Sequence, residues 1–175
     1  MTAAKRKKTP AEAQKPRSLA RVAAVQALYQ MDMAGTDLTD VIDEFVKHRF
    51  TGASAGSEDA EGDNGGSLEG ADSTFFSEIL KGVLRRQRDI DPLVDEQLAI
   101  GWRLVRIDSI LRAILRAGVL ELLERDDVPA RVVINEYINV AHAFFDVEEP
   151  RVVNGVLDRI ARRVRPKEFE DRSTP

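Results

Sequence analysis

Hydrophobic residues recur at helical spacing through most of the 175-residue chain, and no stretch shows the sustained alternation typical of a half-buried strand. The clearest repeat runs from residue 104 to residue 123. Its apolar stripe comprises Leu104, Ile107, Ile110, Leu111, Ile114, Leu115, Gly118 and Leu122. Glycine inside a helix costs about 1 kcal/mol relative to alanine, so Gly118 indicates that a neighbouring helix approaches closely. We expect this segment to be the central buried helix.

Six further helical segments follow from the same spacing and from start and stop signals. Ser18 is the expected N-cap of the first, which reaches about Met33. The others are predicted at 37–50, 73–88, 91–98, from Pro129 to the break at 148–150, and from that break to 165. Seven helices without strands predict an all-α fold in which two small helical subdomains pack together.

Three segments fall outside this pattern. Residues 1–16 are predicted to be a disordered basic arm, and residues 167–175 a polar tail, on either side of a single helical domain at 17–166. Residues 51–73 contain six glycines and six acidic side chains but no basic one, which predicts a flexible acidic insertion. An RNA mimic and a self-inhibitory partner for the basic arm are possible roles. A tolerated surface loop is the favoured interpretation, because lengthening a loop costs little free energy.

Charge is distributed unevenly along the chain. Residues 1–21 carry seven basic side chains and one acidic one, a net +6, so the formal total of −4 leaves −10 for the rest. A basic arm is a frequent electrostatic signature of nucleic-acid binding, because neutralised phosphates release counterions. The alternative is a solvated tail that only aids solubility.

No pattern in the sequence indicates catalysis. The chain has no cysteine, and it shows no phosphate-binding glycine loop, nucleophile elbow or metal-ligand spacing. The acidic pairs Asp126-Asp127 and Glu148-Glu149 precede predicted helices, where the helix dipole favours negative charge. We therefore expect no catalytic residue, no metal site and no cofactor.

The sequence also shows no membrane signal. No apolar run approaches the roughly 20 residues that a bilayer-spanning helix needs, and the N-terminus lacks the apolar core of a secretory signal. The absence of cysteine suits a reducing compartment. A cytoplasmic protein is the expectation.

Two stretches resemble the family of the bacterial transcription antitermination factor NusB. One is DDVPARVVINEYINVAHAFFDVEEPRVVNGVL at 126–157, and the other is RVAAVQALY at 21–29. The resemblance implies the NusB-like all-α fold and a non-catalytic adaptor. It also implies that the chain pairs with the small-subunit ribosomal protein NusE and binds the boxA RNA of nascent ribosomal-RNA transcripts. With the other Nus factors, such an adaptor helps the RNA polymerase elongation complex to resist termination.

The same resemblance implies a set of RNA-binding residues. Arg17, Ser18 and Arg21 match the arginine-rich start of the family's first helix. Residues four apart lie on one side of a helix, so the two guanidinium groups are expected beside each other near a capping hydroxyl. Arg112 and Arg116 could extend this track if the central helix presents its polar side there, and an exposed charged face is their alternative interpretation.

Tyr29 and Val152 are the residues assigned to the protein partner. The family usually has an aromatic residue before Val-Asn-Gly, where this chain has Val152. Trp102 is interpreted as a packed anchor in preference to a base-stacking platform, since single tryptophans are usually heavily buried.

Two other functions compete with the adaptor. A helical module that binds only proteins would make the basic arm incidental. An RNA-targeting domain related to that of ribosomal-RNA cytosine methyltransferases would need a cofactor-binding unit and a cysteine nucleophile, and the chain shows neither.

Overall fold

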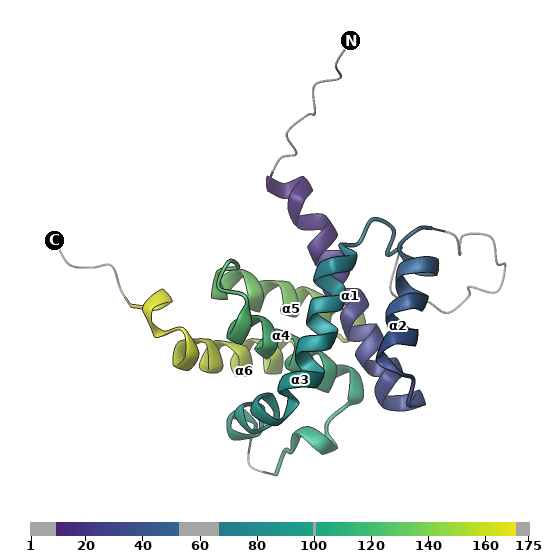
Figure 1. Cartoon of the computed structure of the whole chain (residues 1–175). Helices are drawn as coiled ribbons and strands as arrows, with labels where there is room; N and C mark the ends of the chain where they lie inside the picture. Colours follow the sequence, from purple (N-terminus) through teal and green to yellow (C-terminus); the bar gives the residue numbers. More distant parts are fainter. Residues whose placement is uncertain (1–9, 53–66, 100, 171–175) are drawn as a thin grey trace.

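The computed structural model describes residues 10–52, 67–99 and 101–170, and it contains α-helices but no strand in these ranges. The predicted all-α fold is therefore confirmed (Figure 1). Its helices are α1 (Pro10–Ala34), α2 (Leu38–Glu44), α3 (Ser73–Gln97), α4 (Ser109–Glu124), α5 (Ala130–Phe144) and α6 (Glu148–Val164). Short helical turns follow α2 at Phe45–Arg49, precede α4 at Leu104–Arg106 and follow α6 at Pro166–Glu168.

Helix α4 lies at the centre of the molecule, as its apolar stripe predicts. It packs against α1 and α3 on one side and against α5 and α6 on the other (Figure 1). Two groups of helices thus share one buried helix and one hydrophobic core.

The predicted close approach at Gly118 is also present. A Cβ atom at this position would lie 2.9 Å from Leu157 Cδ1 on α6 and 3.4 Å from Tyr137 on α5. Gly82 on α3 allows a second close approach, because a Cβ there would lie 2.6 Å from Leu120 Cδ2. Glycines thus let α4 pack tightly on both of its sides.

The seven predicted helices become six because 73–88 and 91–98 form one continuous helix. Pro92 lies inside α3, exposed, while Ile90 and Val94 on either side are fully buried. Proline lacks the N–H that would complete a helical hydrogen bond, which is why the sequence suggested a break. The buried side chains on both sides of Pro92 pack into the core, and this tertiary packing favours a continuous helix despite the missing hydrogen bond.

Several predicted boundaries also move. Helix α1 begins at Pro10 and not at Ser18, so residues 10–16 of the predicted arm are helical, and residues 1–9 lie outside the described ranges. Helix α3 begins at Ser73 as predicted, and Asp72 caps it, since the Asp72 side chain accepts from the Phe75 amide. The central helix begins at residue 109 after Asp108, whose side chain accepts from two backbone amides.

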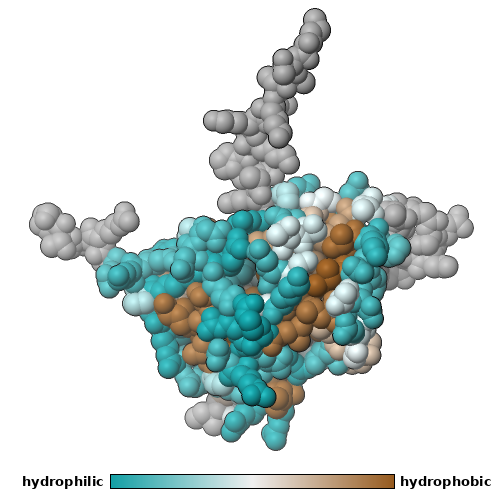
Figure 2. Space-filling model, viewed as in Figure 1, coloured by the Kyte–Doolittle hydropathy of each residue, from teal (hydrophilic) through white to brown (hydrophobic). Residues whose placement is uncertain are grey.

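Most of the acidic insertion, residues 53–66, lies outside the described part of the chain, and so do the roles considered for it. None of the described helices is both long enough and apolar enough to cross a bilayer. Figure 2 shows that hydrophilic residues cover most of the face seen in Figure 1, with hydrophobic residues visible in bands between them.

Candidate RNA and partner surfaces

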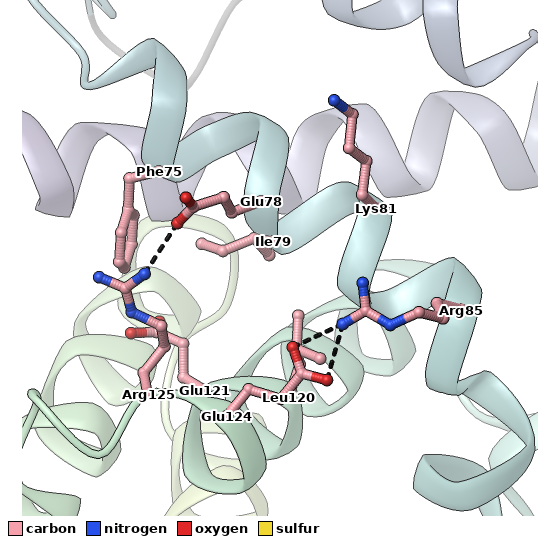
Figure 3. A pocket seen from close by; sticks show the side chains of 9 residues that line it. All are labelled: Phe75, Glu78, Ile79, Lys81, Arg85, Leu120, Glu121, Glu124 and Arg125. Carbon is pink, nitrogen blue, oxygen red and sulfur yellow. Dashed lines mark hydrogen bonds and ion pairs between the residues drawn. The ribbon is translucent and has the colours of Figure 1, made fainter.

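Three guanidinium groups surround one aromatic ring where α1 meets α3 and the end of α4. The central carbons of Arg17, Arg21 and Arg125 lie 4.8, 5.0 and 5.1 Å from the centroid of the buried Phe75 ring. A cation over an aromatic face is attracted by the ring quadrupole. Figure 3 shows Arg125 beside this ring. We call Phe75 and these three arginines the cation cluster.

Within the cation cluster, Arg21 belongs to the core. Its side chain is only 3% exposed, and its Nε and Nη2 atoms donate to the two carboxylate oxygens of Glu121 at 2.8 and 2.9 Å. A third contact joins Arg21 Nη1 to Glu136 Oε2 at 3.5 Å. The sequence predicted the Arg21 guanidinium beside that of Arg17 as an RNA contact, but it is not accessible, because fully buried Glu121 holds it inside.

The electrostatics of this pair follow from its burial. Desolvation lowers the pKa of Arg21, but the hydrogen bond and charge of Glu121 outweigh it, so the pKa lies above its usual value. Tyr137 lies beside the pair. Its phenol has a raised pKa, mainly because it is buried and also because of the nearby charge of Glu121. The Tyr137 hydroxyl is buried and has no hydrogen-bond partner among the residues that the structure describes.

Arg17, in contrast, reaches the surface. Its side chain is 36% exposed, and its Nη1 atom lies 3.3 Å from Oδ2 of Asp127, which is itself 53% exposed. Arg125 Nη2 contacts the same Asp127 oxygen at 3.0 Å. Desolvation raises the pKa of Asp127. The charge of Arg125 and the hydrogen bonds from both arginines lower this pKa by more than desolvation raises it, so it lies below its usual value.

Ser18 does not cap a helix as predicted, because it lies two turns inside α1. Its hydroxyl donates to Glu136 Oε1 at 3.0 Å and so links α1 to α5. Arg125 was not predicted from the sequence. Its position directly before the family-like stretch at 126–157 is the one signal that could have drawn attention to it.

Arg112 and Arg116 join helices together. Arg116 donates from Nε and Nη2 to the two oxygens of Asp91 on α3, both at 2.9 Å. Arg112 pairs with Asp32 on α1 and donates to the carbonyls of Leu104 and Val105. Both side chains are mostly buried, so the alternative of an exposed charged face is wrong.

The residues predicted to contact a protein partner are accessible. Tyr29 and Met33 are exposed at the C-terminal end of α1. Val152 on α6 lines a surface pocket of about 320 Å³ together with Trp102 and Ile107. Val105, in the short turn Leu104–Arg106 that precedes α4, is 73% exposed. We call Tyr29, Met33, Trp102, Val105 and Val152 the apolar surface residues.

The interpretation of Trp102 as a packed anchor is wrong, because its side chain is 51% exposed. It follows Gly101, whose φ of +88° is the left-handed conformation that glycine tolerates, in the turn between α3 and α4. Arg103 and Arg106 are exposed at the same pocket, and neither has an ion-pair partner within the described ranges.

A second pocket, of about 240 Å³, lies between α3 and α4 next to the cation cluster (Figure 3). Two of its arginines pair with acids of the same pocket: Arg85 contacts Glu124 at 2.7 Å and Arg125 contacts Glu78 at 2.8 Å. Among the described residues no three His, Cys, Asp or Glu side chains are grouped as a metal site would require.

Comparisons with known proteins agree on one family. The model of the NusB family matches residues 18–162. "Transcription antitermination protein NusB" of Nitrobacter hamburgensis is 53% identical over 153 residues, which cover 87% of this chain and 90% of the relative. The Rhizobium rhizogenes protein of the same name is 47% identical over 156 residues, covering 89% of this chain and 92% of the relative.

Solved structures agree in fold. NusB of T. maritima superposes with a TM-score of 0.67 at 26% identity, covering 89% of this chain and 97% of that one. A chain of the structure described as "Antitermination Factors NusB and NusE in complex with dsRNA" gives a TM-score of 0.65 at 23% identity, covering 85% and 98%, which is a likeness of fold. On the family model and the curated relatives, the chain belongs to the NusB family.

Proposed function

We propose that this chain is a transcription antitermination factor that binds boxA RNA of nascent ribosomal-RNA transcripts together with NusE. It acts as a non-catalytic adaptor in the RNA polymerase elongation complex with the other Nus factors, in the cytoplasm where transcripts are made. Relatives about half identical to it over most of their length carry the antitermination name. The observation that carries the RNA role is the cation cluster, to which α1, the helix at the basic end of the chain, contributes Arg17 and Arg21.

Arg17 and Ser18 are the direct RNA contacts in this proposal. Arg17 is accessible, and exposed Lys15 extends the cationic surface towards the arm. A flexible single strand can be held there by its phosphates while its bases remain free to be read along their edges. The helix dipole adds little at Ser18, because α1 begins two turns earlier.

The other predicted arginines take different roles. Arg21 positions the cluster, because direct contact with RNA would require its buried pair with Glu121 to open. Arg112 and Arg116 contribute less to RNA binding than Arg17 in this proposal, since each would have to exchange a carboxylate partner for a phosphate.

The apolar surface residues form the site for NusE in this proposal. Exposed tryptophan, tyrosine and methionine are the side chains in which protein interfaces are enriched. A fold neighbour was solved with NusE and double-stranded RNA, so one fold can accommodate both kinds of partner. The same exposed surface favours the rival module that binds only proteins, and RNA binding separates the two.

The deciding experiment titrates the full chain with a boxA oligonucleotide and with a scrambled one, alone and with NusE. We expect a preference for boxA that increases with NusE. Arg17→Ala should weaken boxA binding and flatten its salt dependence by about 0.7 for each phosphate of a single strand that is no longer neutralised. Arg163→Ala, which removes an exposed arginine near the far end of α6, is the matched control. Equal affinity for both oligonucleotides in all conditions would favour the protein-binding module.

A separate experiment addresses the partner surface. Val105→Asp should weaken NusE binding without altering thermal stability, because Val105 is largely exposed. Leu84→Asp makes the same chemical change at an exposed apolar position of α3 that does not line the Trp102 pocket. Equal loss of NusE binding in both variants would show that NusE does not bind at the apolar surface residues.

A further inference from the structure

A single carboxylate oxygen bridges the two accessible arginines of the cation cluster. Asp127 Oδ2 lies 3.3 Å from Arg17 Nη1 and 3.0 Å from Arg125 Nη2. The Phe75 ring lies against both guanidinium groups, so it helps to fix the space between them. Phosphate oxygens are held by arginine pairs through the same kind of charge-assisted hydrogen bond.

We propose that Arg17 and Arg125 together form a phosphate-binding site for the transcript, and that Asp127 occupies this site until an RNA phosphate displaces it. The inference rests on the proposed RNA-binding function and deepens it. It adds Arg125 as an RNA contact and makes Asp127 a built-in competitor that sets the affinity.

The exposure of the groups makes the exchange feasible. The side chains of Arg17 and Asp127 are 36% and 53% exposed, and an exposed ion pair contributes little free energy. The neighbouring Arg21–Glu121 pair is almost inaccessible, so it stays closed while the outer pair exchanges. A strand can thus enter the outer half of the cation cluster without disturbing the core.

Arg125 also keeps its position when Asp127 leaves. Its Nη1 atom remains bound to Glu78 Oε2 at 2.8 Å, and its guanidinium remains over the ring (Figure 3). Asp127 is the better competitor of the two acids, because it contacts both arginines.

The test compares Asp127→Asn with Asp126→Asn in titrations of the full chain with the boxA oligonucleotide. The two variants change the net charge equally at adjacent positions. Asp126 is 95% exposed, and its ion-pair contact within the described ranges is a long one, at 4.0 Å from Arg165. We expect Asp127→Asn to tighten binding about two- to fivefold, the range that removal of a competing exposed ion pair allows. Asp126→Asn should stay close to the wild type.

A double-mutant cycle assigns the effect to Arg125. Arg125→Gln keeps most of the aliphatic stem and should weaken RNA binding. Asp127→Asn should give a smaller gain in that background than in the wild type, because only Arg17 is then freed. Arg85→Gln, which removes another exposed arginine of the α3–α4 region that pairs with Glu124, is the control. In that background the gain from Asp127→Asn should persist.

The outcomes separate this inference from the proposed function. If the wild type prefers boxA but both aspartate variants bind equally, the competitor role of Asp127 is overturned while the adaptor function stands. If Asp127→Asn gains as much affinity in the Arg125→Gln background as in the wild type, Arg125 is not part of the site. If the wild type binds no RNA with or without NusE, the proposed function fails and the site fails with it.

Discussion

The buried pair of Arg21 and Glu121 explains why one arginine of a predicted RNA site is inaccessible. Both side chains are almost completely buried, and the guanidinium meets the carboxylate with two nearly equal hydrogen bonds. Burying a charge is costly unless a partner satisfies it, so each residue requires the other. The pair joins α1 to the central helix and holds the base of the cation cluster.

The first prediction concerns this pair. Arg21→Ala should lower the free energy of unfolding by about 3–5 kcal/mol, because it leaves the Glu121 carboxylate buried without its partner. Arg17→Ala, which opens an exposed pair one turn away, should cost less than about 1 kcal/mol. Chemical denaturation of both variants measures the difference. Similar losses in the two would mean that the buried pair is not a structural element.

The second prediction concerns Tyr137 and alkaline pH. Its folded-state pKa lies above the usual value of 10.0, so its stabilising contribution is complete below pH 10 and is lost as the pH rises above that value. Tyr137→Phe should change stability by less than about 1 kcal/mol at neutral pH, because the buried hydroxyl has no hydrogen bond among the described residues. It should also flatten the alkaline decline in thermal stability. If the difference in thermal stability between the wild type and Tyr137→Phe is constant from about pH 7 to about pH 11, ionisation of Tyr137 does not cause the alkaline decline.

At the residue scale the sequence identified Arg17 and Arg21, but it did not identify Arg125 or the surroundings of any of the three. A helical stripe shows which side faces the core, yet Arg21 lies at its edge, where burial depends on a partner 100 residues away. Trp102 shows the opposite error. Its size suggested burial, while its position in a glycine-led turn keeps it at the surface.

At the element scale, local signals predicted the helices well and their ends less well. Helix α2 begins at Leu38, one residue from its predicted start, and α6 ends before Pro166. Pro92 and Ser18 suggested boundaries that are absent, because both lie within longer helices. At Pro92, core packing of Ile90 and Val94 on either side favours a continuous helix, and no local window contains that packing.

The third prediction compares glycines on three helices. Gly118→Ala and Gly82→Ala should each destabilise by about 1–3 kcal/mol, since the new methyl would meet Leu157 at 2.9 Å or Leu120 at 2.6 Å. Gly155→Ala should instead stabilise by up to about 1 kcal/mol, because its methyl meets the flexible end of Arg159, at 3.2 Å. Thermal unfolding of the three variants gives the order. Equal effects would exclude close packing as the reason for glycine on α3 and α4.

At the scale of the whole molecule, the fold was predictable because amphipathic stripes of this length can bury themselves only against each other. The candidate site was predictable only in part. Arg17 followed from the family-like motif, but Phe75, Asp127 and Arg125 come together through contacts between distant segments. No spacing along the chain places these residues beside Arg17.

The last prediction concerns the charge asymmetry between the arm and the body. Lys5, Arg6, Lys7 and Lys8 give the first eight residues a charge of +4, next to a body of opposite net charge. Changing all four to glutamine should weaken boxA binding at low salt and reduce the slope of log affinity against log salt by about 0.7 for each phosphate that these side chains neutralise. Changing Arg151, Arg159, Arg162 and Arg163 on α6 removes the same charge elsewhere and should leave the slope nearly unchanged. Equal flattening in both variants would mean that the overall charge attracts RNA, and the arm would then have no role of its own.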